Sequence, residues 1–228
     1  MSKLIVGVPV CNDKESFIEM IDSLITSTDA YDKNAYDKIV IIESGSTDGC
    51  AEFCDGLAEQ YKFIEVHHTE KEGPLKAYNR LFDIAKQEES DLLLTQTDVV
   101  FPKLYKRDWL AWFKRVSTVE DLGAIIPLNG GGINGPDYIE GFEWVGGWCT
   151  YLPYRTIKRG IKFDDKFPNG YGVDVDLTKQ IIEAGLRIGK LDYWVDHHMQ
   201  NERAHDNSPE SEKMKQASSK YFREKWKI

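Results

Sequence analysis

Two acidic segments of this chain contain residue types that can carry out chemistry. In the first, Asp174 and Asp176 stand where the aromatic and glycine-rich stretch 167–172 enters an expected helix. A carboxylate at such a turn can face a cleft, where partial desolvation raises its affinity for a proton and suits it to act as a general base. Asp-x-Asp before a helix is also a common capping device, because Asp is favoured at helix N-termini. A second acidic turn upstream favours chemistry over capping.

That second turn is Gln96-Thr97-Asp98, at the end of an apolar strand. The chain lacks both GxGxxG after its first strand and GxxxxGK[ST], so a bound diphosphate would need another source of neutralising charge. A divalent cation held by Asp98 supplies it, since carboxylate and amide oxygens suit Mg²⁺ or Mn²⁺. A lone Asp at a strand end can equally be a turn residue.

The elements that position these turns alternate between strand and helix in the first half. Apolar runs and helical spacing predict strands at Lys3–Val10, Lys38–Ile42, Phe63–Val66 and Asp91–Thr95, and helices at Lys14–Thr26, from the cap Ser46-Thr47-Asp48 to Gln60, and at Gly73–Lys86. This alternation predicts an α/β fold with a Rossmann-like, mostly parallel sheet flanked by helices. Ligands then bind beyond the carboxyl ends of the strands.

The second half is less regular. We expect helices at Trp109–Val116 and Val173–Ala184, and a C-terminal helix that Ser208-Pro209 opens, with strands at Gly123–Pro127, Trp144–Leu152 and Ile188–Val195. The glycine-rich stretch 130–135 is either an acceptor lid or a flexible connection.

Composition limits the classes of function. The chain has 228 residues, 41% of them hydrophobic, and a formal net charge of −9, so nothing in the overall field draws it to nucleic acid or to an anionic membrane. No apolar run approaches the roughly 20 residues that span a bilayer, and the N-terminus turns polar too soon for a signal peptide. We expect a cytoplasmic protein without a transmembrane segment.

The cysteines are scattered and lack any CxxC pair. Cys11, Cys50, Cys54 and Cys149 have no His at zinc-finger spacing, which argues against a disulfide framework and against structural zinc. We expect buried free thiols.

Five motifs in order resemble family 2 glycosyltransferases of the GT-A fold. They are Pro9-Val10-Cys11-Asn12, the segment Glu43-Ser44-Gly45-Ser46-Thr47-Asp48-Gly49, Gly73 through Asn79, Gln96-Thr97-Asp98-Val99, and Gly170-Tyr171-Gly172-Val173-Asp174-Val175-Asp176-Leu177. The resemblance covers roughly Lys3 to His198. It implies a single domain, 1–228, with a nucleotide-sugar half at 1–100, an acceptor half at 101–200 and a C-terminal helix at 207–226.

The resemblance also implies roles for residues on the donor side. Nucleotide contacts would come from Pro9, Val10, Asn12, Glu43, Ser46, Asp48, Gly73, Asn79, Gln96 and Thr97. Glu43 stands where the family has an Asp, and Ser44 replaces a second Asp. The donor is a nucleoside-diphosphate sugar, with uridine diphosphate favoured over guanosine or thymidine diphosphate.

The family's D-x-D metal motif maps onto Gln96-Thr97-Asp98, where the first acid has become an amide. The resemblance implies Mn²⁺ or Mg²⁺ at Asp98 with a late histidine, His198 or His197, as a further ligand. Adjacent histidines on a strand point to opposite faces, so one alone can serve. Either histidine can also simply be packed or exposed.

The family's E-D-x-D motif maps onto residues 173–176, with Val173 in place of the Glu, and implies that Asp174 is the catalytic base. One base on the face opposite the leaving group predicts inversion at the anomeric carbon. On the acceptor side, which binds a carbohydrate or another hydroxyl compound, we expect Trp148, Tyr171 and Asp176, although aromatic residues more often pack in the core.

Two other functions stay open at this point. A sugar nucleotidyltransferase could use a similar sheet, but its glycine-rich, basic first loop is missing here. A catalytically degenerate domain that binds carbohydrate or protein would explain why Gln96 and Val173 stand at acidic positions of the family.

Overall fold

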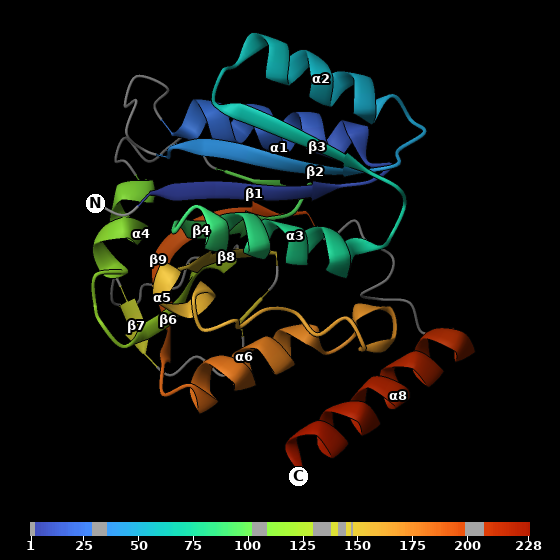
Figure 1. The fold of residues 1–228 in the computed structure, drawn as a ribbon, viewed down its shortest axis with the longest axis vertical. Helices are drawn as coiled ribbons and strands as arrows, with labels where there is room; N and C mark the ends of the chain where they lie inside the picture. Colours follow the sequence, from blue (N-terminus) through green and yellow to red (C-terminus); the bar gives the residue numbers. More distant parts are fainter. Residues whose placement is uncertain are drawn as a thin grey trace.

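The computed structural model describes residues 3–28, 36–101, 109–129, 138–140, 145, 146, 148–198 and 208–228. The glycine-rich stretch 130–135 and Trp144 lie outside the described residues. Within the described ranges, helices flank one mixed sheet (Figure 1). None of the helices in these ranges combines the length and the apolar character that crossing a bilayer requires.

The first half alternates strands and helices, as the sequence predicts. Its elements are β1 (Leu4–Val10), α1 (Lys14–Ser27), β2 (Lys38–Ser44), α2 (Cys50–Gln60), β3 (Ile64–Thr69), α3 (Pro74–Gln87) and β4 (Asp91–Thr95). β1 lies between β2 and β4 and runs parallel to both, and β3 extends the parallel set beyond β2. The carboxyl ends of β1, β2 and β4 therefore meet at one edge of the sheet.

The core lies on both faces of this sheet. In β1, Leu4 and Val6 pack into a cluster with residues of α1 and α4, whereas Ile5 packs with residues of α3 and α6 on the other face. Because both faces are covered, β1 has no polar positions, which explains its continuous apolar run.

The second half adds strands of both directions. Its elements are β5 (Val99–Val100), α4 (Trp109–Val116), β6 (Leu122–Asn129), β7 (Tyr138–Glu140), β8 (Cys149–Leu152), α5 (Tyr154–Ile157), the 3₁₀ turn η1 (Pro168–Gly170), α6 (Val173–Glu183), β9 (Arg187–His197) and α8 (Pro209–Trp226). The strand order is β3-β2-β1-β4-β8-β6-β9-β5, with β7 beside β9.

The predicted α/β class with flanking helices is confirmed, with more antiparallel pairing in the second half than the sequence suggests. β8 runs antiparallel to both β4 and β6, and β9 pairs antiparallel with β5 and β7. All four residues of β8 are buried, so its sequence carries no periodicity that distinguishes the two directions.

The C-terminal helix begins as its sequence signals predict. The Ser208 side chain accepts a hydrogen bond from the Ser211 amide at 3.2 Å, and Pro209 occupies the first helical position. α8 lies at the side of the molecule next to η1 (Figure 1).

Candidate functional site

A cavity of about 760 Å³ opens at the sheet edge where β1 and β4 end. Eight of the predicted site residues line it, namely Pro9, Val10, Asn12, Gly73, Gln96, Thr97, Asp98 and Asp174. The helices α3 and α6 reach the same cavity with their N-terminal ends, through Pro74 and Val173. The two acidic turns, which are far apart in sequence, thus belong to one site.

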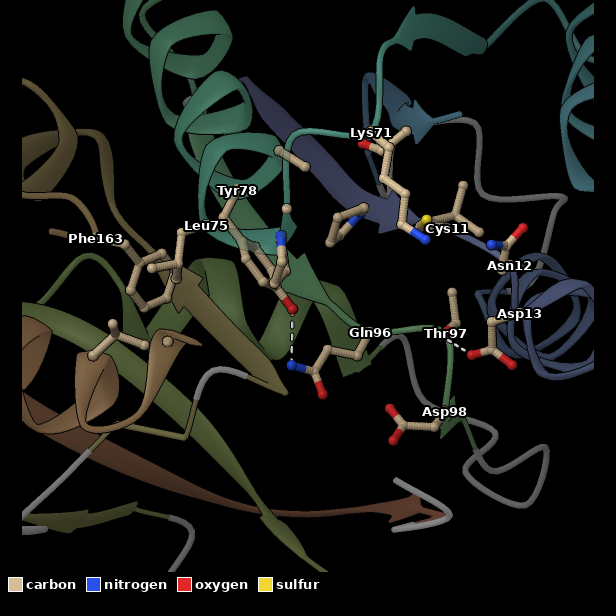
Figure 2. A pocket seen from close by; sticks show the side chains of 18 of the residues that line it. Cys11, Asn12, Asp13, Lys71, Leu75, Tyr78, Gln96, Thr97, Asp98 and Phe163 are labelled. Atoms are coloured by element: carbon tan, nitrogen blue, oxygen red, sulfur yellow. Dashed lines mark hydrogen bonds between the residues drawn. The ribbon is translucent and has the colours of Figure 1, made fainter. Parts of the chain in front are cut away.

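Asp98 and Asp174 both face this cavity and act on a common neighbour. The neighbour is Tyr78 of α3, whose pKa is raised first by burial and then by the negative charges of Asp174 and Asp98. The phenol therefore stays protonated. Its oxygen accepts a hydrogen bond from the Gln96 amide nitrogen at 2.8 Å (Figure 2).

Asp98 is the most enclosed acid of the site. Its residue is 5% exposed, and its Oδ1 atom is buried without a hydrogen-bond partner. The other oxygen, Oδ2, lies 3.4 Å from Nε2 of His197. A buried carboxylate oxygen without a partner is costly, so this geometry fits a group that binds a cation.

His197 is the histidine beside Asp98, because β9 pairs His197 with Val99. Its ring stacks on the indole of Trp148, with ring centroids 5.1 Å apart and an interplanar angle of 14°. By contrast, Nε2 of His198 lies 3.1 Å from Asp196, and Nδ1 lies 3.9 Å from Glu19. Of the two histidines that the sequence offers as a metal ligand, His197 therefore has its ring beside the Asp98 carboxylate, whereas the ring of His198, the first choice from the sequence, contacts Asp196 instead.

The residues that the structure describes do not by themselves supply a full set of metal ligands here. Among the described residues, no three His, Cys, Asp or Glu side chains converge tightly enough to hold an ion. Mg²⁺ and Mn²⁺ commonly take one or two protein ligands and complete their shell with water and phosphate oxygens. Asp98 with its unpartnered Oδ1 fits such an ion.

Asp174 is positioned by a turn that depends on glycine. Gly170 and Gly172 both have φ of 78°, a left-handed backbone that other residues adopt at a cost, and Gly172 immediately precedes α6. Asp174 follows in the first turn of α6, where its backbone carbonyl accepts the Thr178 hydroxyl at 2.7 Å. The helix N-terminus thus holds this carboxylate at the cavity wall.

Asn12 joins the loops after β1 and β2. Asn12 has φ of 52°, its backbone amide donates to Ser46 Oγ at 3.0 Å, and its side-chain oxygen accepts the Thr47 amide at 2.7 Å. Asp48 accepts the backbone amides of Lys14 and Cys50 at 3.0 and 3.1 Å. Ser46 and Asp48 do not line the cavity. Through their hydrogen bonds to the amides of Asn12 and Lys14 they hold the loop after β1, which does line it.

Glu43, predicted at the nucleotide, lies behind the cavity wall at 2% exposure. Its carboxylate accepts the Ser46 amide at 2.6 Å and contacts Nδ1 of His68 at 3.0 Å, and His68 also contacts Asp55 at 2.8 Å. Burial raises the pKa of Glu43, but the hydrogen bonds from His68 and Ser46 outweigh it and leave that pKa lowered. The hydrogen bonds of His68 to Glu43 and then to Asp55 raise the pKa of His68. Ser44 lines the cavity instead of Glu43.

Four further predicted residues lie outside the main cavity. Asn79 donates to the Phe163 carbonyl at 2.9 Å and lines a neighbouring cavity of about 470 Å³. Tyr171 contacts Ser211 of α8 at 2.9 Å through its hydroxyl, and Trp148 packs on His197. Asp176 is fully buried and accepts the Trp226 indole N–H at 2.9 Å.

Sequence reasoning missed Lys71 and Cys11 as cavity residues. Lys71 supplies the only lysine or arginine of the described lining, which also carries the acids Asp13, Asp98 and Asp174. Figure 2 shows Lys71 with Asp13 and Asp98 in the cavity. The place of Lys71 two residues before Gly73, at the start of the third motif, is the sequence signal that could have indicated its place in the cavity. Cys11 is half-buried, whereas Cys50, Cys54 and Cys149 are buried free thiols as predicted.

A comparison with protein families agrees with the predicted family. Residues 5–115, just under half of the chain, match the model of Glycosyl transferase family 2. A search of curated proteins finds no match.

Solved glycosyltransferase structures share the fold at low sequence identity. The mannosyltransferase PcManGT from Pyrobaculum calidifontis, in complex with GDP-Man and Mn²⁺, aligns with TM-score 0.67 and 16% identity over 90% of this chain and 59% of its own. GalNAc-T7 with UDP, GalNAc and Mn²⁺ gives TM-score 0.69 and 13% identity over 86% and 44%. TarS 1–349 of S. aureus gives TM-score 0.62 and 17% identity over 85% and 60%. The chain thus spans less than two thirds of each of these proteins.

Proposed function

We propose that this chain, whose residues 5–115 match the model of Glycosyl transferase family 2, transfers a sugar from a nucleoside-diphosphate donor to a hydroxyl acceptor. The observation that carries the proposal is the shared cavity of Asp98 and Asp174. A transferase of this kind needs one group that manages the charge of the leaving diphosphate and another that removes the acceptor's proton. The two carboxylates suit these two tasks.

The charge of the cavity supports a role for a divalent cation. Its described lining carries Asp13, Asp98 and Asp174 against Lys71, so a diphosphate entering alone would meet net negative charge. Asp98, with His197 beside it, would hold Mn²⁺ or Mg²⁺, and when bound the cation stabilises negative charge on the diphosphate leaving group. PcManGT and GalNAc-T7 were both solved with Mn²⁺.

Lys71 and the loop 9–12 provide the remaining nucleotide contacts. The Lys71 ammonium can pair with a phosphate oxygen, and Ser44 and Cys11 flank the region of the cavity near the end of β1. We favour uridine diphosphate over guanosine diphosphate as the carrier. Solved complexes of similar fold include both carriers, GDP-Man with PcManGT and UDP with GalNAc-T7.

Asp174 is the proposed general base. As a carboxylate at the cavity wall it can accept the proton of an acceptor hydroxyl as that oxygen bonds to the anomeric carbon and the bond to the diphosphate breaks. Direct displacement by a hydroxyl on the face opposite the leaving group inverts the anomeric configuration. Tyr78 stays protonated next to both acids and is therefore not a competing base.

The second candidate is a catalytically degenerate domain that binds carbohydrate or protein. Gln96 and Val173, which stand at acidic positions of the family, are the observation in its favour. Val173 is 7% exposed and packs in the core, and Gln96 donates to Tyr78, so neither residue leaves an unfilled place in the fold. The proposed ion and base use Asp98 and Asp174, which the chain retains.

The test is a screen of nucleotide sugars for slow donor hydrolysis, which needs no acceptor. The proposal predicts release of nucleoside diphosphate from at least one donor in the presence of Mn²⁺ or Mg²⁺, and loss of that release with EDTA. Donor binding without any turnover, alone or with a panel of sugar acceptors, would favour the degenerate domain.

A further inference from the structure

The most deeply buried charge next to the site is Asp176, two residues after the proposed base. Its side chain is 0% exposed and accepts hydrogen bonds from Lys225 Nζ at 2.8 Å, Trp226 Nε1 at 2.9 Å and Gln180 Nε2 at 2.7 Å. A buried carboxylate is stable only with such partners. Two of the three come from the last turn of α8, about fifty residues further along the chain.

Lys225 holds a second carboxylate at the same time. Its Nζ atom lies 2.8 Å from Asp164, which also accepts the Tyr221 hydroxyl at 2.9 Å. Burial lowers the pKa of Lys225, but hydrogen bonds to Asp164 and Asp176 outweigh burial and leave that pKa raised. Burial raises the pKa of Asp164, but the hydrogen bonds from Lys225, the Lys166 amide and Tyr221, together with the charge of Lys225, outweigh burial and leave that pKa lowered. The ammonium and the carboxylate therefore stay charged at neutral pH.

Asp164 and Asp176, the two anchors that Lys225 binds, lie at the ends of the stretch of chain that we call the 164–176 segment. Within it, Gly170, Val173 and Asp174 line the main cavity. α8 also contacts the segment between the anchors, through the hydroxyl pair of Ser211 and Tyr171 at 2.9 Å and an edge contact of Tyr221 on Phe167 at 4.9 Å. α8 thus runs along the side of the segment away from the sheet (Figure 1).

The geometry of α6 links Asp176, which contacts α8, to Asp174, the proposed base. Residues two apart on an α-helix project about 200° apart around its axis, so Asp174 and Asp176 face nearly opposite sides of α6. Asp174 lines the cavity, and Asp176 faces α8. A shift or rotation of the first turn of α6 that loosens Asp176 therefore moves Asp174 as well.

We propose that Lys225 and Trp226 of α8 are positioning residues, which hold the first turn of α6 through Asp176 and thereby set the placement of the Asp174 carboxylate. This inference rests on the proposed function, because it concerns the base of that reaction. It makes the last turn of α8 part of the support of the acceptor side of the site. The residues around Asp98 lie on other elements and do not depend on this contact.

The test compares Lys225→Met, Trp226→Phe and the double variant Asp176→Asn/Lys225→Met with the wild type and with Lys220→Met. Trp226→Phe keeps an aromatic ring and removes the N–H that reaches Asp176. The double variant removes the Asp176 charge together with Lys225, so Asp176 is not left as an unpaired buried charge, while Asp164 keeps its hydrogen bonds from the Tyr221 hydroxyl and the Lys166 amide. Lys220 is the control, because it lies on α8 with its side chain 77% exposed and pairs only loosely with Glu224, at 3.8 Å.

For each variant, kcat and donor KM are measured, together with the Kd of nucleoside diphosphate and Mn²⁺ by calorimetry and hydrogen exchange of the 164–176 segment. We expect kcat of Lys225→Met to fall roughly tenfold or more, with the Kd unchanged within about twofold and faster exchange in the segment. Trp226→Phe should lower kcat less than Lys225→Met does. The double variant should keep kcat below that of the wild type, because it lacks the contact between Lys225 and Asp176, and Lys220→Met should match the wild type.

The proposal is wrong if Lys225→Met keeps wild-type kcat, or if kcat and nucleotide affinity fall together, since a general loss of fold produces the latter. Should Lys225→Met not fold, Trp226→Phe and the double variant decide by the same criteria. An inactive wild type would contradict the proposed function instead, and the exchange of the 164–176 segment would still report whether α8 holds it.

Discussion

Replacing Asp174 by Asn separates the chemistry of this residue from its structural role. The side chain keeps nearly the same volume and loses its negative charge and its ability to take up a proton. The hydrogen bond from the Thr178 hydroxyl to the backbone carbonyl of residue 174 does not involve the side chain of residue 174 and is retained. Asp174 therefore offers a change that affects the proposed base and leaves the surrounding packing in place.

The expected loss of rate is much larger than the expected loss of stability. General base catalysis contributes on the order of 10²- to 10⁴-fold, which at 1.36 kcal/mol per decade corresponds to roughly 2.7–5.4 kcal/mol in the barrier. The loss of a negative charge in the first turn of α6 costs about 0.3–1 kcal/mol of helix stabilisation. For a chain of this size, that lowers Tm by about 1–4 °C.

The assay is acceptor-dependent transfer by wild type and Asp174→Asn at matched saturation with donor and Mn²⁺, with nucleotide Kd from calorimetry and Tm from a thermal melt. We expect kcat to fall by the factor above while the Kd stays within about threefold. Because removal of a negative charge next to a diphosphate can only favour the anion, weaker nucleotide binding is not expected. Transfer at near the wild-type rate would refute the assignment of the base.

Three further perturbations probe the phosphate contact, the loop support and the packing behind α6. Lys71→Met should weaken nucleoside-diphosphate binding roughly tenfold in calorimetry, because it removes the cation of the described cavity lining; unchanged affinity would exclude a phosphate contact. The pKa of His68 is raised by Glu43 and then Asp55, so its contribution to stability is fully present below the unfolded pKa of about 6.5 and is lost as pH rises through the higher folded pKa. His68→Asn should lower the free energy of unfolding, measured in urea, by less than about 1 kcal/mol, because the ring is half-exposed. This loss should become smaller between about pH 6 and about pH 9. A loss that stays constant with pH would contradict the coupling of His68 to Glu43 and Asp55. Gly123→Ala should lower the free energy of unfolding by about 1–3 kcal/mol in a denaturant titration, since its Cβ would lie 2.6 Å from Ile181 Cγ2 and 2.8 Å from Leu186 Cβ; wild-type stability would show that α6 can move away.

The first half of the fold could be predicted because three of its four strands, β1, β2 and β4, are buried on both faces. Asp91–Thr95 has the predicted bounds, and β1 and β2 differ from prediction by one or two residues at their ends. The short strand β5 was not predicted, because two residues carry no periodicity and its pairing partner, β9, lies almost a hundred residues away.

The site could be predicted only as far as a residue type determines its surroundings. Asp98 and Asp174 follow from turn position and motif, and both line the cavity. Glu43 and Asp176 fit the same motifs equally well, yet His68 and Lys225 bind them away from the cavity. Those partners lie 25 and 49 residues further along the chain, and nothing local to either acid indicates them.

The central claim is that Asp98 seats a divalent cation that lets a nucleoside diphosphate enter an acidic cavity. The most direct measurement is calorimetric titration of uridine and guanosine diphosphate into wild type and Asp98→Asn, each with Mn²⁺ and with EDTA. We predict that wild type binds at least one nucleotide with Mn²⁺, at least tenfold more tightly than with EDTA, and that Asp98→Asn loses this difference. Equal affinity of the wild type with Mn²⁺ and with EDTA, or a full Mn²⁺ effect in folded Asp98→Asn, would contradict the account.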